Sequence, residues 1–288
     1  MLTPNQKLAF LQKSTLIQDD DSDPGGRIYL DNQGNVYHSV TRILSATAAP
    51  DKKKALDNWL ARPGSAVDRD TAARRGTAAH ASAEYLLKTA KRLATYSANK
   101  KRGWKENDQG LERPYSAITR WAINRAMAGV PVAPWGVQGY ARGLTNWINE
   151  NVTAIYGCEF STQHPGGWAG TCDALLGIDS NGSHPGGGSG PGDMWIVDWK
   201  TSASRNPEKS KHDYFCQMAA YSLGLKHMTG LEAAGACIVL ARRSGAPIEW
   251  RLDRAELTHY ESVFQDRAFD YFSQLLKVDP DPGATQAA

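Results

Sequence analysis

Apolar and polar positions along the chain predict the strands of one sheet. The segment RIYLDNQGNVYHSV predicts a hairpin, with strands at 27–30 and 35–40 and a turn at Gly34. Later β-rich runs predict further strands at 152–163, 171–178, 195–202, 236–241 and 248–252. In WIVDWKTS, alternation places Asp198 and Lys200 on one face of its strand, where two charges need partners.

Apolar residues at steps of three or four predict the helices. The predicted segments are a short helix after a cap at Ser39 or Thr41, then 51–60, 68–95, 139–150, 213–228 and a last helix. That last helix opens with the capping pattern Asp253 to Glu256 and carries an apolar stripe from Leu257 to Leu275. The order of elements predicts an α/β fold with a central mixed β-sheet flanked by helices and a largely helical N-terminal part.

One domain is expected over residues 27–278. Residues 1–26 are expected to be a flexible N-terminal segment, and residues 279–288 a disordered tail. The stretch 179–193 is a glycine-rich loop, and 88–135 is a basic and aromatic insertion that fits no simple pattern.

Composition narrows the class of protein only a little. With 41% hydrophobic residues in 288, the chain can bury a core, and a net charge of +3 decides nothing. The apolar stretch 233–241 is too short to cross a bilayer and no secretory signal is visible, so a cytoplasmic protein without membrane contact is expected. The four cysteines form no CxxC pair, which argues against a zinc ribbon or an iron–sulfur cluster and favours buried free thiols.

The distribution of charge is more informative than its total. Seven basic residues and no acidic one lie between Glu84 and Glu106. The neighbouring aromatic residues are Trp104, Tyr115, Trp121 and Trp135. Basic residues can follow a sugar–phosphate backbone while aromatic rings stack on bases. The alternatives are a solvated basic surface and aromatic residues that pack a helical subdomain.

Two carboxylates on neighbouring strands form the candidate chemical centre. Asp173 in TCDALLGI and Asp198 can come within a few ångströms of each other, and Lys200 shares the face of Asp198. Carboxylates that close repel unless a cation lies between them, and all-oxygen sites suit magnesium or manganese.

Two helices supply further candidates. His80 and Glu84 share a helix face, where Gly76 one turn earlier allows a close approach; a structural histidine is the alternative. Gln217 and Tyr221 also stand four residues apart, as a pair at the site or as a satisfied polar residue in a core helix. Glu159, on the preceding strand, is a further candidate site residue; the alternative is a glutamate side chain that faces solvent.

Taken in order, the motifs GTAAH, GWAGTCD, IVDWKTS and QMAAY resemble the PD-(D/E)XK nuclease superfamily and, more narrowly, its RecB-like exonuclease branch. The segments YHSVTRIL and RRGTAAH are similar to the phage and mitochondrial-genome-maintenance type of exonuclease. The resemblance covers roughly residues 27–225. D-x-K alone occurs by chance in many proteins, whereas four motifs in order are far more specific.

The resemblance implies roles for these residues. His80, Asp173, Asp198 and the backbone carbonyl of Trp199 would bind Mg²⁺ or Mn²⁺. Lys200 would be the catalytic lysine, and Gln217 and Tyr221 would shape the site and contact the substrate backbone. Glu84 and Glu159 are further candidate ligands, because branches of the superfamily differ at these positions. Some relatives hold an iron–sulfur cluster through four cysteines, but the cysteines of this chain do not match that pattern and no cluster is expected.

The expected function is metal-dependent hydrolysis of DNA from single-stranded ends, leaving 5′-phosphate products, in the cytoplasm of a host cell if the protein is of phage origin. The residues expected to bind nucleic acid are Arg75, Lys88, Lys91, Arg92, Lys100, Lys101, Arg102 and Trp104. The alternatives are a structure-specific endonuclease, a non-catalytic nucleic-acid-binding protein with the same fold, and a phosphoesterase for small substrates.

Overall fold

The computed structural model describes residues 3–12, 16–19, 26–106, 110–178, 194–203 and 207–278. The predicted glycine-rich loop at 179–193 and the predicted tail at 279–288 lie outside these residues. None of the described helices is both long enough and apolar enough to cross a membrane.

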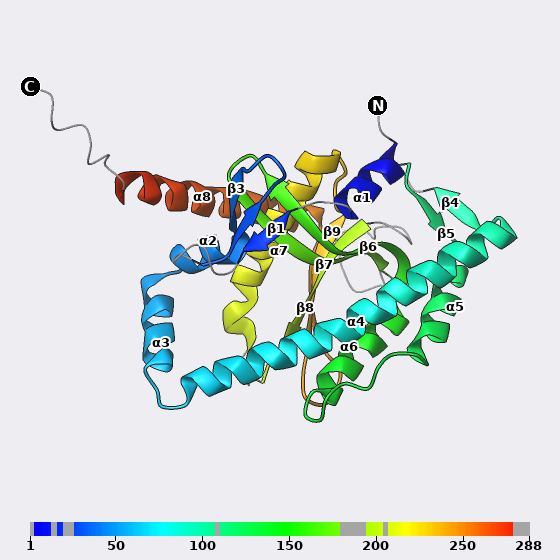
Figure 1. Cartoon of the computed structure of the whole chain (residues 1–288), viewed down its shortest axis with the longest axis horizontal. Coiled ribbons are helices and arrows are strands. Elements are labelled where there is room, and N and C mark those ends of the chain that lie inside the picture. The colour runs from blue at the N-terminus through cyan, green and yellow to red at the C-terminus, as the bar shows by residue number, and fades with distance from the viewer. Residues whose placement is uncertain are drawn as a thin grey trace, which may run out of the picture.

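The described chain is arranged as runs of strands and runs of helices (Figure 1). The strands are β1 (Ile17–Asp19), β2 (Ile28–Leu30), β3 (Val36–Ser39), β4 (Trp104–Glu106), β5 (Glu112–Pro114), β6 (Val152–His164), β7 (Trp168–Ile178), β8 (Met194–Thr201), β9 (Gly235–Ala241) and β10 (Ile248–Leu252). The helices are α1 (Pro4–Gln12), α2 (Val40–Ala46), α3 (Pro50–Leu60), α4 (Ser65–Lys101), α5 (Ser116–Met127), α6 (Gln138–Asn151), the short 3-10 helix η1 (Pro207–Ser210), α7 (Lys211–Thr229) and α8 (Arg254–Val278).

A mixed eight-stranded sheet forms the centre of the fold. Its main path runs β1-β2-β3-β7-β8-β9-β10, and β6 also pairs with β7. The pairs β3–β7 and β8–β9 are parallel, and the other pairs of this sheet are antiparallel. The α/β class with a central mixed sheet is therefore confirmed.

Strand β7 has three neighbours, which leaves an opening in the sheet. Strand β6 pairs along one edge of β7, from Trp168 to Ile178. Strands β3 and β8 must share the other edge: β3 pairs with Trp168 and Ala169, and β8 pairs with Ala174 to Gly177. Among the described residues, positions 170–173 therefore have no ladder partner on that edge.

Helices cover both faces of the sheet (Figure 1). One core cluster joins the sheet to α7 and α8, with contributions from α1 and α2; the other joins it to α4, α5 and α6. Strand β9 is buried at every position, as expected for a strand whose two faces are both covered. The predicted cap at Ser39 and the capping pattern of Asp253 with Glu256 are both present.

Helix α4 is longer than the predicted segment 68–95. Its 37 residues span about 55 Å, and it begins directly after Gly64, whose φ of 84° suits glycine. The C-terminal extension is packed against the rest of the protein, because Ser97 and Ala98 are buried. Residues 88–135, expected as one insertion, thus divide among the end of α4, the β4–β5 hairpin, α5 and a loop.

The N-terminal segment differs from the expectation of a flexible stretch over residues 1–26. Its described part contains α1 and β1, and β1 pairs with β2 from Ile17 to Asp19. Leu8 of α1 is buried in the core cluster of α7 and α8. The burial of Leu8 and the pairing of three residues of β1 account for the regular structure of this segment. Neither contact could be predicted from a short, polar-rich sequence.

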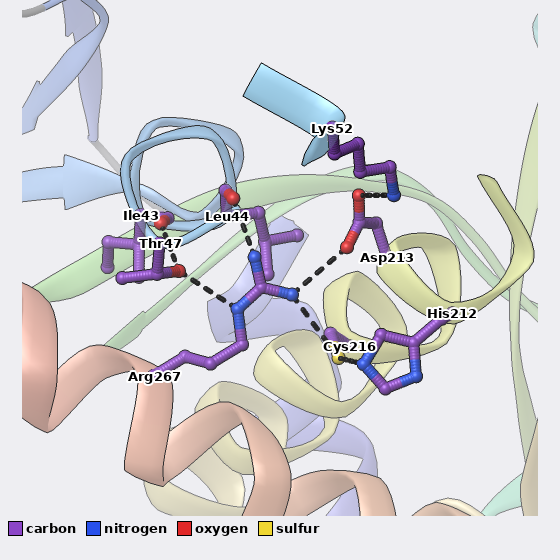
Figure 2. A network of polar contacts seen from close by, with 8 residues as sticks. All are labelled: Ile43, Leu44, Thr47, Lys52, His212, Asp213, Cys216 and Arg267. Carbon is purple, nitrogen blue, oxygen red and sulfur yellow. Dashed lines mark hydrogen bonds and ion pairs between the residues drawn. The ribbon is translucent and has the colours of Figure 1, made fainter. Parts of the chain in front are cut away.

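A partly buried arginine joins four helical segments (Figure 2). The Arg267 guanidinium donates hydrogen bonds to Thr47 Oγ1 (2.9 Å), to the Leu44 carbonyl (2.6 Å) and to Asp213 Oδ1 (3.0 Å). The other oxygen of Asp213 lies 2.5 Å from Lys52 Nζ. This network connects α8 to α2, α3 and the first turn of α7.

Candidate active site

Strands β7 and β8 separate at the two aspartates predicted from the sequence. The last ladder pair at this end joins Ala174 to Val197, so Asp173 and Asp198 occupy the next position on each strand. There the Trp199 backbone N–H donates to Asp173 Oδ2 at 2.7 Å. A side-chain carboxylate thus accepts a backbone hydrogen bond at the point where the ladder ends, and this fixes Asp173 against β8.

Asp198 and Lys200 form a buried ion pair. Asp198 is only 2% exposed, and its Oδ2 lies 2.5 Å from Lys200 Nζ without any hydrogen bond of regular geometry from the described residues. Burial raises the pKa of Asp198 and Asp173 adds to the rise, whereas Lys200 opposes it. Burial acts to lower the pKa of Lys200, but attraction to Asp198 and Asp173 outweighs it and raises that pKa. The lysine is therefore held as an ammonium ion.

His80 reaches this pair of strands from α4. Its Nδ1 lies 3.4 Å from Asp173 Oδ1. Burial alone would lower the pKa of His80, but the Asp173 and Asp198 carboxylates outweigh burial and raise it. The histidine is thus in contact with a predicted ligand.

Glu159 lies beside Asp173 in an unusual backbone conformation. Cys158 pairs with Ala174 and Phe160 with Cys172, so Glu159 lies opposite Asp173 on β6. Its φ is 49°, in the left-handed region that non-glycine residues rarely adopt. Burial, followed by Asp173 and Glu84, raises the pKa of Glu159 to about 7. A strained backbone and a crowded carboxylate at one position are typical of functional sites.

These groups line one polar cavity of about 280 Å³. Of the residues predicted from sequence, it contains His80, Glu159, Asp173, Asp198, Lys200, Gln217 and Tyr221. Other lining residues, which the sequence did not single out for the site, are Gln18, Arg27, Tyr29, Ser39, Val40, Thr41, Gly170 and Thr171. These come from β1 to β3 and the residue before β2, from the start of α2, and from positions 170–171 of β7, and only the folded chain brings them together.

Helix α7 presents the polar pair Gln217 and Tyr221 to the cavity. Gln217 Nε2 donates to the Tyr221 hydroxyl at 2.7 Å. Gly170 is needed for this arrangement, because a Cβ at that position would lie 2.5 Å from the Tyr221 ring. A glycine inside a strand is the sequence signal that could have identified this contact.

Two expectations about α4 are changed by the structure. Glu84 lies outside the cavity and forms an ion pair with Lys88, although its charge acts on Glu159. Gly76 was expected to clear space, yet a Cβ there would make only an ordinary contact of 3.7 Å with Thr201 Oγ1. The Trp199 side chain packs in the core cluster of α4 to α6, and its N–H is the group seen at the site.

The donor set fits a divalent cation chemically. No group of three His, Cys, Asp or Glu side chains within the described residues has an arrangement ready to coordinate an ion. The Lys200 ammonium and the Trp199 N–H lie against the carboxylate oxygens that would bind one. However, the cavity gathers three carboxylates and a histidine, and Asp198 Oδ2 lacks a regular hydrogen bond. Hard cations such as magnesium prefer such oxygen donors.

The residues expected to bind nucleic acid lie in different surroundings. Arg75 stacks over the Tyr140 ring, Lys91 Nζ donates to the Tyr156 carbonyl at 2.6 Å, and Trp104 donates to Asn99. Burial lowers the pKa of Lys91 to about 8. The exposed members of the set are Lys88, Arg92, Lys100, Lys101 and Arg102.

Replacing Glu159 with glycine or with alanine separates its backbone strain from its carboxylate. Both variants lose the carboxylate, but only glycine adopts a φ of 49° without strain. We expect Glu159→Gly to unfold with a free energy about 1 kcal/mol higher than Glu159→Ala, measured by urea denaturation. Equal stabilities would show that the backbone at this position is not strained.

A comparison with protein families agrees with this geometry. The family model described as the PD-(D/E)XK nuclease superfamily matches residues 54–282. No match was found among curated proteins. The matched segment contains every strand from β4 to β10, with Asp173, Asp198 and Lys200 at its centre. The chain therefore belongs to the PD-(D/E)XK nuclease superfamily.

Proposed function

We propose that this protein is a metal-dependent exonuclease of the RecB-like branch, which hydrolyses DNA from single-stranded ends and leaves 5′-phosphate products. One observation carries the proposal: Asp173, Asp198 and Lys200 meet where β7 and β8 separate, inside an open polar cavity. Carboxylates and an ammonium ion at one point are suited to a phosphodiester, which needs both a cation and a positioned water.

Asp173 and Asp198 are the proposed ligands of Mg²⁺ or Mn²⁺, with His80 and the Trp199 carbonyl completing the set. When bound, such an ion lowers the pKa of a water molecule and draws charge from the phosphate. Glu159 is a candidate ligand because it lies opposite Asp173 across the ladder, where burial and the neighbouring carboxylates of Asp173 and Glu84 raise its pKa to about 7. Glu84 lies outside the cavity and affects Glu159 only through its charge.

Lys200 is the proposed catalytic lysine. Its ammonium orients the attacking water and stabilises the hydroxide that forms as this water gives a proton to the surrounding solvent. A new bond then joins this oxygen to phosphorus, the bond from phosphorus to the 3′-oxygen breaks, and the 3′-oxygen takes up a proton from solvent. Gln217 and Tyr221, which are hydrogen-bonded to each other, hold the substrate backbone beside the cavity.

End-labelled linear single-stranded DNA and a circular single strand of the same sequence test the proposal. We expect linear DNA to be degraded with Mg²⁺ or Mn²⁺ to products with 5′-phosphates, chelator to stop the reaction, and the circle to stay intact. Equal cleavage of the circle would establish an endonuclease. Binding without cleavage under all conditions would establish a non-catalytic protein and refute the proposal.

A further inference from the structure

One solvent-exposed stripe of α4 combines aromatic and basic side chains. We name it the outer stripe and define it as Tyr85, Lys88, Arg92, Tyr96 and Lys100, which follow one another at steps of three or four residues. All five are exposed, Tyr85 by 39% and Tyr96 by 61%. The opposite side of the helix is fixed in the core, so the orientation of the stripe is fixed too.

The outer stripe has a single sign of charge. Helix α4 has no acidic residue after Glu84, and Glu84 itself is paired with Lys88. The N-terminal part of the same helix is different, because it mixes Asp68 and Asp70 with its arginines. A polyanion is therefore favoured along the C-terminal half of the helix only.

The outer stripe begins five residues after His80, the residue that α4 contributes to the catalytic cavity. A surface groove of about 570 Å³ runs along α4 and is lined by Glu84, Tyr85, Lys88 and Arg92 among others. The charge of Glu84, which lines the groove, raises the pKa of Glu159, which lines the cavity. The groove and the cavity are therefore close enough for their charges to interact. From His80 to Lys100 the helix rises about 30 Å, which is enough for several nucleotides.

Each of the two exposed tyrosines has a neighbour beside its ring. The Tyr85 hydroxyl lies close to Gly129, where an added Cβ would be 3.1 Å from it, so a larger residue at 129 would displace the ring. Lys100 Nζ lies 4.7 Å from the centre of the Tyr96 ring. Exposed aromatic rings beside cations are the surfaces on which single-stranded bases stack, at about 1–3 kcal/mol per base.

We propose that the outer stripe binds the single strand behind the end that enters the catalytic cavity, with phosphates on Lys88, Arg92 and Lys100 and bases on Tyr85 and Tyr96. This inference rests on the proposed function and adds the direction of the strand: away from the cavity, toward the C-terminal end of α4. Affinity then depends on strand length as well as on the end.

Two double variants separate charge from stacking. Binding of fluorescent oligo(dT) of about four and about sixteen nucleotides is measured by anisotropy in chelator, so that no cleavage occurs. For Arg92→Gln/Lys100→Gln, we expect the magnitude of the slope of log affinity against log salt concentration to decrease by about 1.4. Each of the two lost phosphate contacts accounts for about 0.7 of this decrease. For Tyr85→Ala/Tyr96→Ala, we expect at least about tenfold weaker binding of the longer strand with an unchanged slope.

Arg69→Gln/Arg74→Gln is the matched control, because it removes two exposed charges from the other half of the same helix. We expect wild-type binding for this control. The proposal is overturned if the control loses as much affinity as the stripe variants, if the stripe variants keep the full gain from the longer strand, or if a duplex binds the wild type as tightly as a single strand. If one of these three binding results is found and the wild-type protein cleaves DNA, only the proposal about the outer stripe is refuted. If the wild-type protein never cleaves DNA, the proposed function is refuted.

Discussion

Asp198→Asn should reduce the rate of DNA cleavage by about a thousandfold or more, while the protein stays folded and still binds single-stranded DNA. The carboxylate that is lost is the most deeply buried charge of the cavity and the partner of Lys200. The substitution keeps the shape of the side chain, so packing around β8 is preserved. Single-turnover cleavage of end-labelled DNA with Mg²⁺, together with anisotropy in chelator, measures both effects.

Asp266→Asn is the control for this experiment, because it makes the same chemical change on an exposed position of α8. We expect it to cleave at the wild-type rate. If Asp198→Asn also digests DNA at the wild-type rate, Asp198 has no part in the reaction and the proposed site is wrong.

Arg267→Met should lower the free energy of unfolding by about 3 kcal/mol. The variant retains the apolar stem but leaves the Leu44 carbonyl without its donor and Asp213 with Lys52 alone. Burial acts to raise the pKa of Asp213, but Lys52 and Arg267 outweigh it and lower that pKa from its ordinary 3.8. The stabilisation by this carboxylate is therefore present above pH 3.8 and lost as pH falls through the lower native pKa, so the difference between wild type and variant should shrink in acid.

Lys52→Met tests the same network from its exposed end. The Lys52 side chain is 40% exposed against 14% for Arg267, so we expect a loss below about 1 kcal/mol. A double-mutant cycle between Arg267→Met and Asp213→Asn, followed by urea denaturation, isolates their coupling. Equal losses for the Lys52 and Arg267 variants would contradict the idea that burial makes Arg267 the centre of the network.

Local pattern was enough to predict the central part of the fold. Strands β6 to β10 and helices α3, α6, α7 and α8 lie close to the predicted ranges, because the local residue pattern of these segments is typical of their structure. The face shared by Asp198 and Lys200 also follows from alternation alone, and both line the same cavity. The superfamily was predicted from four motifs and is confirmed.

Long-range geometry could not be predicted in this way. The separation of β7 from β8 depends on β3 and β8 sharing one edge of β7, which no local pattern encodes. The positive φ of Glu159 occurs where this residue of β6 lies opposite Asp173 of β7, so it depends on how the two strands pair. Arg267 contacts residues more than two hundred positions earlier, so its role was invisible in a sequence of ordinary helical appearance.

Helix α4 carries both His80 and the outer stripe in a single angular register. His80 and the outer stripe lie on one uninterrupted helix, in which successive residues are rotated by about 100° around the helix axis. One residue inserted between Glu84 and Tyr85 would therefore rotate the stripe by about 100° relative to His80, whereas seven inserted residues would restore its direction to within about 20°. Chain-length variation among relatives that keep this arrangement should accordingly occur at the ends of the helix, and not between His80 and Lys100.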